Sequence, residues 1–268
     1  MAELSSDRPG FRDWVRRQVV PNWPKLPLTH ITKGLLAEDI YRAGEISPTP
    51  CKVFGEKPLA YFFYGRPSYR VGGDGPIKAE AACPFCFLFD SAIISDAKAI
   101  FPFDTGAYDA RMYKNAVTDE MKVGDFSLEV STDIPNQLIQ GAFRSMSAYL
   151  DGDSRRAVSP EEGAESWEMH ARAYLSLVGS HGRNEPDDRI ASIEVVFDKP
   201  ILLPGALKAV IVPHTFWGSD VRAPWLDNLS KDGVEVYPFQ FLPGRSADYY
   251  YALIEAQSRE IYRNWGVL

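Results

Sequence analysis

The sequence lacks any apolar run long enough to cross a membrane, since its longest runs, such as residues 209–212, have only the length of a strand. It is also poor in cysteine, and its three thiols cannot all pair with one another, which excludes a disulfide framework. Residues 1–8 are polar and charged and contain no apolar signal core. Together these absences predict a cytoplasmic protein with reduced thiols and no membrane association.

Several widespread active-site motifs are missing as well. The chain has no Walker loop, no Rossmann glycine fingerprint, no Gly-x-Ser-x-Gly elbow and no His-Glu-x-x-His motif. Cys83 and Cys86 have the spacing of a zinc or redox motif, but a zinc site needs four ligands and the sequence offers few others. Their apolar flanks favour a buried strand, so no metal is expected. The net charge of −7 argues against broad electrostatic binding of nucleic acid, although it leaves room for a local basic groove.

The 268 residues do contain enough apolar side chains to form a core that needs no disulfide or metal ion for stability. We find no internal repeat, low-complexity tract or convincing linker, so one domain over residues 1–268 is expected. Apolar periodicity and turn residues predict strands at residues 28–34, 58–67, 83–89, 97–103, 126–130, 189–197, 207–213 and 234–241. They predict helices near residues 11–19, 35–43, 136–149, 160–178 and 246–264, with irregular chain at 104–114 and 217–233. This mixture favours an α+β fold.

The most informative stretch is residues 28–70. Its first strand carries His30 and Thr32, which project to the same face because they are two residues apart. A short helix follows and ends at Gly44, a glycine in the position that commonly terminates helices. The second strand, residues 58–67, is rich in aromatic residues and leaves through Arg66 and a proline.

This order of His-x-Thr strand, short helix and aromatic strand resembles the NAD-binding half of ADP-ribosyltransferases, and most closely the DarT-like group. The resemblance covers the first quarter of the chain well, one later strand fairly and the middle hardly at all. It implies a split, mostly antiparallel β-sheet core with flanking helices, NAD as the substrate, and transfer of ADP-ribose to a nucleic-acid base or a protein. It also implies that His30 contacts the adenosine-side ribose and that Thr32 helps to seat the nicotinamide. The implied setting is a bacterial toxin or an anti-phage effector.

The aromatic strand offers flat rings to a cationic ligand such as oxidised nicotinamide. Because side chains alternate along a strand, either Tyr61 or Tyr64 can face the ligand, and the other belongs to the core. Tyr69 adds a further ring just beyond the strand. Arg66 has the donor geometry to neutralise a pyrophosphate or to align the substrate, and its alternative is a solvent-facing turn arginine.

A transferase of this kind also needs a carboxylate near the ribose, where positive charge develops as the bond to nicotinamide breaks. Glu194 is the best candidate, because it is an acid within an otherwise apolar strand, and Ser192 lies two residues earlier on the same face. We expect residues 207–213 to form a neighbouring strand. The alternative is an edge strand on which Glu194 faces water, and Glu235 is the second candidate for the acid.

Asp104, Thr105 and Gly106 have the local form of an aspartic-protease turn. That chemistry needs two aspartates that share a proton, and no second copy of the motif occurs, so a homodimer would be required. A dimeric single-motif aspartic protease and a non-catalytic nucleotide-binding module therefore stand as alternatives to the transferase. The resemblance does not account for this turn.

Overall fold

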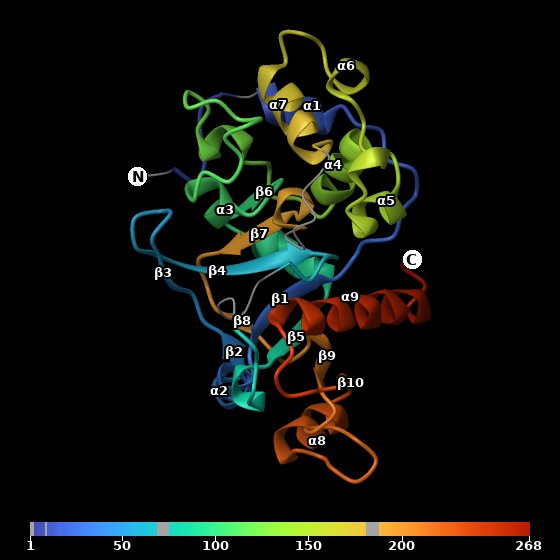
Figure 1. Cartoon of the computed structure of the whole chain (residues 1–268). Coiled ribbons are helices and arrows are strands. Elements are labelled where there is room, and N and C mark those ends of the chain that lie inside the picture. Colours follow the sequence, from blue (N-terminus) through green and yellow to red (C-terminus); the bar gives the residue numbers. More distant parts are fainter. Residues whose placement is uncertain (1–2, 9, 69–74, 181–187) are drawn as a thin grey trace. The chain divides into compact units, whose positions relative to one another are not determined.

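The helices and strands of the computed structural model fall into two units, each with its own set of paired strands (Figure 1). The structure describes residues 3–8, 10–68, 75–180 and 188–268. Unit 1 comprises Met1–Lys25, Pro48–Tyr64 and Ile94–Asp198, and unit 2 comprises Leu26–Ser47, Gly65–Ile93 and Lys199–Leu268. The chain therefore passes between the units several times, and the expectation of a single domain stays a prediction.

Unit 1 contains an antiparallel arrangement centred on a short strand, β7. Its strands are β3 (Thr49–Cys51), β4 (Lys57–Tyr64), β6 (Ala99–Phe101) and β7 (Glu194–Phe197). β7 pairs antiparallel with both β4 and β6, and β3 pairs antiparallel with β4. β7 is buried along its whole length, which explains why it reads as a nearly continuous apolar run.

The helices of unit 1 are short and surround an aromatic cluster. They are α1 (Gly10–Arg16), α3 (Thr105–Asp109), α4 (Ile134–Phe143), α5 (Met146–Asp151), α6 (Pro160–Gly163) and α7 (Met169–Val178), with 3-10 turns at Val123–Phe126, Ser154–Arg156 and Asp188–Ala191. A further 3-10 turn, Ser91–Asp96, spans the point in the chain where unit 2 passes into unit 1. Phe11 on α1 packs against Trp14, Phe126 and Tyr174, with ring centroids 5.3–5.6 Å apart. Such offset and edge-on contacts add to the burial of apolar area, so this cluster holds the helices together.

Unit 2 is built on the completely buried strand β5 (Pro84–Phe89). The strand order is β10 (Glu235–Phe239), β9 (Leu207–Pro213), β5 and β1 (Leu28–Lys33), and β2 (Glu45–Ile46) pairs separately with β8 (Ile201–Leu202). The β1–β5 and β5–β9 pairs are antiparallel and the β9–β10 pair is parallel. Its helices are α2 (Gly34–Ala43), α8 (Pro224–Lys231) and α9 (Ala247–Asn264), with a 3-10 turn at Glu80–Ala82. Mostly antiparallel strands with flanking helices agree with the expected α+β class.

The elements with the strongest local signals lie where the sequence places them. The first strand and the helix after it are β1 and α2, and Gly44 takes the left-handed conformation at the end of α2 with φ of 72°. β5, β9, β10 and α9 also coincide with predicted elements. Cys83 and Cys86 are buried, as their apolar flanks predict.

Other expectations were wrong, mostly where tertiary contacts override a local pattern. The irregular chain at 104–114 contains α3, and the loop-rich stretch at 217–233 contains α8. The helix expected at 136–149 is two helices, because Arg144 adopts a left-handed conformation with φ of 52°. The helix expected at 160–178 also breaks in two, and Trp167, assigned to its apolar stripe, is 71% exposed.

Two strand predictions also need correction. In place of a strand at 126–130 the structure has a 3-10 turn and a single bridge from Leu128 to Ile100. In place of a strand over all of 189–197, the chain forms a 3-10 turn and then β7, so Ser192 lies before the strand. The neighbours of β7 are β4 and β6, whereas β9, the expected neighbour, pairs with β5 and β10.

Over the residues described, no helix combines the length and the apolar composition that a membrane crossing requires.

Candidate functional site

Glu194 is a buried acid on the central strand of unit 1. It is the first residue of β7, its side chain is 2% exposed, and its neighbours in register are Phe63 on β4 and Phe101 on β6. The alternative of an edge strand on which Glu194 faces water is therefore wrong, since β7 has a partner on each side. A carboxyl group placed among aromatic neighbours is costly to bury unless other groups compensate it.

The compensating groups come from Thr105, at the start of α3. Its backbone N–H donates to Oε2 of Glu194 at 3.2 Å, and its hydroxyl donates to Oε1 at 2.7 Å. Thr105 follows closely after Phe101, the β6 residue paired with Glu194, so a short return of the chain brings it back to the carboxylate. The two bonds hold the carboxyl group in one orientation, since both of its oxygens are engaged.

Tyr61 and Cys51 lie on the same face of the strands as Glu194. Tyr61 is two residues before Phe63 on β4, so the side chains of both point to the face that carries Glu194. The Tyr61 hydroxyl donates to Sγ of Cys51 on β3, at 2.6 Å, and both residues are half-buried. The structure thus brings an aromatic ring with partial exposure to the neighbourhood of the buried acid.

The electrostatics of this group favour a protonated Glu194. Burial is the main cause that raises its pKa well above the ordinary value, and the negative charge of Asp104 raises it further, while the bonds from Thr105 act in the opposite direction. Burial also raises the pKa of Tyr61, followed by its bond to Cys51 and by the charge of Glu194. A glutamate with a raised pKa is suited to proton exchange near neutral pH and to placing charge in a site of low dielectric.

Tyr64 and Ser192 lie elsewhere in unit 1. Tyr64 points to the opposite face of β4, is fully buried, and donates from its hydroxyl to Oδ1 of Asn136 on α4 at 2.8 Å. Tyr149 on α5 donates to the Tyr64 carbonyl at 2.5 Å. Ser192 is completely buried just before β7. Of the two tyrosines predicted to face a ligand, the structure brings Tyr61, and not Tyr64, to Glu194.

Unit 2 holds the other predicted residues. His30 and Thr32 lie on β1, opposite Phe87 and Phe85 of β5, with His30 half-buried and Thr32 buried. Arg66 is 3% exposed, so the alternative of a solvent-facing turn arginine is wrong. Its carbonyl accepts from the hydroxyl of Thr29 at 3.0 Å, which attaches the Arg66 segment to β1. Tyr69 lies outside the described residues.

Glu235, the second candidate for the acid, is exposed at the start of β10 in unit 2. Its carboxylate accepts from Nε1 of Trp265 at 3.1 Å and from the Tyr237 hydroxyl. A solvated carboxylate with surface partners needs no further explanation, so Glu235 is the weaker candidate.

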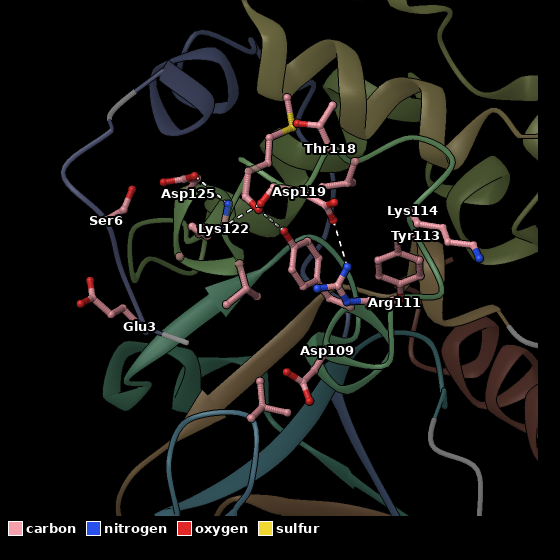
Figure 2. Close-up of a pocket in the computed structure, with 16 residues that line it drawn as sticks. Glu3, Ser6, Asp109, Arg111, Tyr113, Lys114, Thr118, Asp119, Lys122 and Asp125 are labelled. Atoms are coloured by element: carbon pink, nitrogen blue, oxygen red, sulfur yellow. Dashed lines mark hydrogen bonds and ion pairs between the residues drawn. The ribbon is translucent and has the colours of Figure 1, made fainter. Parts of the chain in front are cut away.

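A cavity of about 640 Å³ opens next to the far end of α3 in unit 1 (Figure 2). Charged side chains of both signs surround it, among them Asp109, Arg111, Lys114 and Lys122, and Arg111 forms an ion pair with Asp119 at 3.0 Å. The sequence did not indicate this cavity, because residues 104–114 read as irregular chain. The mixed charge of its lining does not define one class of ligand.

Thr105 and Cys51 are the site residues that the sequence did not assign. Thr105 was visible only as part of an isolated three-residue turn, and no local signal marked Cys51, which reaches Tyr61 through strand pairing. Within the described part of the chain, no group of three His, Cys, Asp or Glu side chains is arranged to hold a metal ion.

Known proteins offer no relative of this chain with which to compare the site. The chain matches no protein-family model, and no curated protein or solved structure is significantly similar to it.

Proposed function

We propose that this protein is an NAD-dependent ADP-ribosyltransferase that moves ADP-ribose to a nucleic-acid base or a protein, with Glu194 as the catalytic acid. The observation that carries the proposal is the setting of Glu194: a fully buried carboxyl group on a central strand, oriented by two bonds from Thr105 and accompanied by the ring of Tyr61. A buried carboxyl group of this kind is costly for stability, which points to a role in chemistry.

The chemistry of this donor set fits the transfer. Cleavage of the bond between ribose and nicotinamide creates positive charge on the ribose, and a carboxylate that is already oriented stabilises it without reorganisation. The ring of Tyr61 offers a face to the cationic nicotinamide, a contact worth about 0.5–2 kcal/mol. Thr105 keeps the Glu194 oxygens from turning away, so the carboxylate is ready when the charge develops.

The residues of unit 2 take the binding roles that the resemblance to DarT-like enzymes implies. His30 would contact the adenosine-side ribose, Thr32 would help to seat the nicotinamide amide, and Arg66 would face the pyrophosphate or the acceptor. Arg66 is buried, and its segment is bonded to β1, the strand that carries His30 and Thr32. Ser192 and Tyr64, the other residues predicted to bind NAD, are both buried in unit 1.

Two observations favour different acceptors for the ADP-ribose. The DarT-like resemblance favours a nucleic-acid base, whereas the net charge of −7 favours a protein or a small molecule as the acceptor. A role as a bacterial toxin or anti-phage effector follows from the resemblance alone.

The proposal is tested by incubating the protein with NAD labelled in its adenylate phosphate and a bacterial lysate. Label should pass to protein or nucleic acid with the wild type and not with Glu194→Gln. Treatment of the product with protease or nuclease identifies the acceptor. Binding of NAD without transfer in any lysate would favour the non-catalytic module, and cleavage of lysate proteins that is lost in Asp104→Asn would favour the aspartic protease.

A separate binding measurement tests the NAD assignment. NAD at millimolar concentration should raise the melting temperature, because a ligand that binds only the folded state stabilises it by mass action, by about 2.7 kcal/mol at 100 times Kd. The rise should shrink in His30→Ala. The same melting temperature with and without NAD in both proteins would remove NAD as the substrate.

A further inference from the structure

The proposed function uses Thr105 of the turn formed by Asp104, Thr105 and Gly106, but it gives Asp104 no role. It begins three residues after Phe101 on β6 and opens α3. Thr105 supplies both of the hydrogen bonds described above to Glu194, one from its backbone and one from its side chain. The turn is thus attached directly to the buried acid on β7.

Asp104 is held in the same turn by two contacts of its own. Its Oδ1 accepts from the backbone N–H of Ala107 at 2.9 Å, the usual arrangement of an aspartate that caps a helix. Its carbonyl accepts from the Tyr113 hydroxyl at 3.3 Å. Gly106 leaves room for the carboxylate, because a Cβ at this position would come within 3.0 Å of Oδ1 of Asp104. The fixed backbone of the turn therefore brings a second carboxyl group to the neighbourhood of Glu194.

We propose that Asp104 and Glu194 form a carboxyl pair that carries one proton and one negative charge, with Asp104 and Thr105 as positioning residues that tune Glu194. The catalytic consequence rests on the proposed transferase function, whereas the pair itself rests on the turn, in which Asp104 directly precedes the residue that bonds both oxygens of Glu194. Two neighbouring carboxyl groups, one fully buried and one half-buried, do not both ionise readily, so the second proton is held to a higher pH than either group would show alone.

The direction of each influence on Glu194 follows from the contacts. Burial and the charge of Asp104 raise its pKa, the Thr105 bonds lower it, and Cys51 raises it further. Besides Asp104, the thiol of Cys51 and the hydroxyl of Tyr61 are titratable groups coupled to Glu194, and the hydroxyl remains neutral because burial raises its own pKa. Once the pair has lost its first proton, the remaining proton therefore resides on the more deeply buried Glu194, and the ionised form needed for charge stabilisation appears as pH rises further.

Removing the charge of Asp104 and removing the hydroxyl of Thr105 should move the pKa of Glu194 in opposite directions. Asp104→Asn keeps the helix cap, since asparagine caps as well as aspartate, but removes the charge, so the pKa of Glu194 should fall. Thr105→Val keeps the shape and removes the hydroxyl bond, so the pKa should rise. Thr105→Ser, which restores the hydroxyl, should titrate like the wild type. Asp109→Asn, at the far end of the same helix, is the matched control and should leave the titration unchanged.

The titration is measured by carbon NMR of the full chain labelled at the glutamate side-chain carboxyl, with the Glu194 signal identified by its loss in Glu194→Gln. The expected result is a titration of Glu194 above that of the other glutamates, lowered by Asp104→Asn and raised by Thr105→Val. A Glu194 signal that does not move in Asp104→Asn overturns the pair. If that variant does not fold, Asp104→Ser, a second neutral cap, takes its place in the same test.

Activity then separates the pair from the transferase. If label is transferred from NAD, the acidic limb of the pH–rate profile should shift to lower pH in Asp104→Asn and to higher pH in Thr105→Val. Shifts in the NMR titration without any transfer of label would retain the pair and reject the proposed function. If label is transferred but the acidic limb of the pH–rate profile lies at the same pH in both variants as in the wild type, the proposed function is retained and the pair is rejected.

Discussion

Glu194 and Glu235 are each the first residue of a short strand, one in each unit. Glu194 is almost completely buried and is bonded by Thr105, whereas Glu235 is exposed and is bonded by Trp265 and Tyr237. Both precede apolar strand residues, so their local sequences look alike. The comparison teaches that burial and fixed donors, rather than sequence context, distinguish an acid suited to catalysis from one that caps a surface strand.

The difference between the two acids should be largest in turnover. Glu194→Gln removes charge stabilisation that exists only in the transition state, so turnover should fall by roughly 10²-fold, about 2.7 kcal/mol, with little change in NAD affinity. Glu235→Gln should stay close to the wild type. Initial rates with labelled NAD measure both. Loss in Glu235→Gln with full activity in Glu194→Gln would transfer the catalytic role to unit 2.

The tyrosines beside the two acids offer a second, smaller contrast. Tyr61→Ala removes the ring proposed to contact nicotinamide and should weaken NAD binding by about 0.5–2 kcal/mol, while Tyr61→Phe keeps the ring and should bind nearly as well. Tyr237→Ala, which removes the tyrosine bonded to Glu235, is the matched control and should leave binding unchanged. Isothermal titration with NAD measures the differences. Equal binding by all three variants would remove Tyr61 from the ligand site.

Stability should also depend on pH in a way that reflects the buried acid. The pKa of Glu194 is higher in the folded than in the unfolded protein, because of burial and then of Asp104, so the folded state holds more protons above about pH 4.5. The stabilisation from the protonated group is complete below the unfolded pKa and is lost as pH rises through the folded one. Wild type should therefore lose stability relative to Glu194→Gln as pH rises.

Urea unfolding of the two proteins across this pH range measures the effect. The same comparison with Glu235→Gln provides the baseline for removing an acid from the surface. A difference between wild type and Glu194→Gln that stays constant with pH would contradict the raised pKa.

The smallest expected effect concerns the three thiols, whose reactivity should differ according to whether they are buried or accessible. Burial raises the pKa of Cys83 to about 12, with a further rise from the charge of Glu80, and burial also raises the pKa of Cys86. In the folded protein we expect a disulfide reagent to modify Cys51 alone, and slowly, because this thiol is half-buried. Cys83 and Cys86 should react only after unfolding. We also expect the protein to contain no zinc. Zinc that is lost on Cys83→Ser would contradict this.

The sequence by itself determined the elements whose signals are local. β1, α2 with its terminal Gly44, β5 and α9 could be predicted because alternation, helical spacing and a glycine terminator act over a few residues. It also singled out Glu194, because an acid in an apolar strand is unusual whatever its surroundings. The Asp104 turn was noticed as well, although nothing in the sequence connected it with Glu194.

Only the tertiary structure decided which residues meet. Glu194 pairs in register with Phe63 and Phe101, far from it in the chain, and Thr105 reaches it through a turn that reads as irregular. The break of the predicted helix at Arg144 and the exposure of Trp167 likewise depend on packing that no local pattern records. The physical reason is that strand pairing and burial act between residues distant in sequence, whereas propensity and periodicity act only between neighbours.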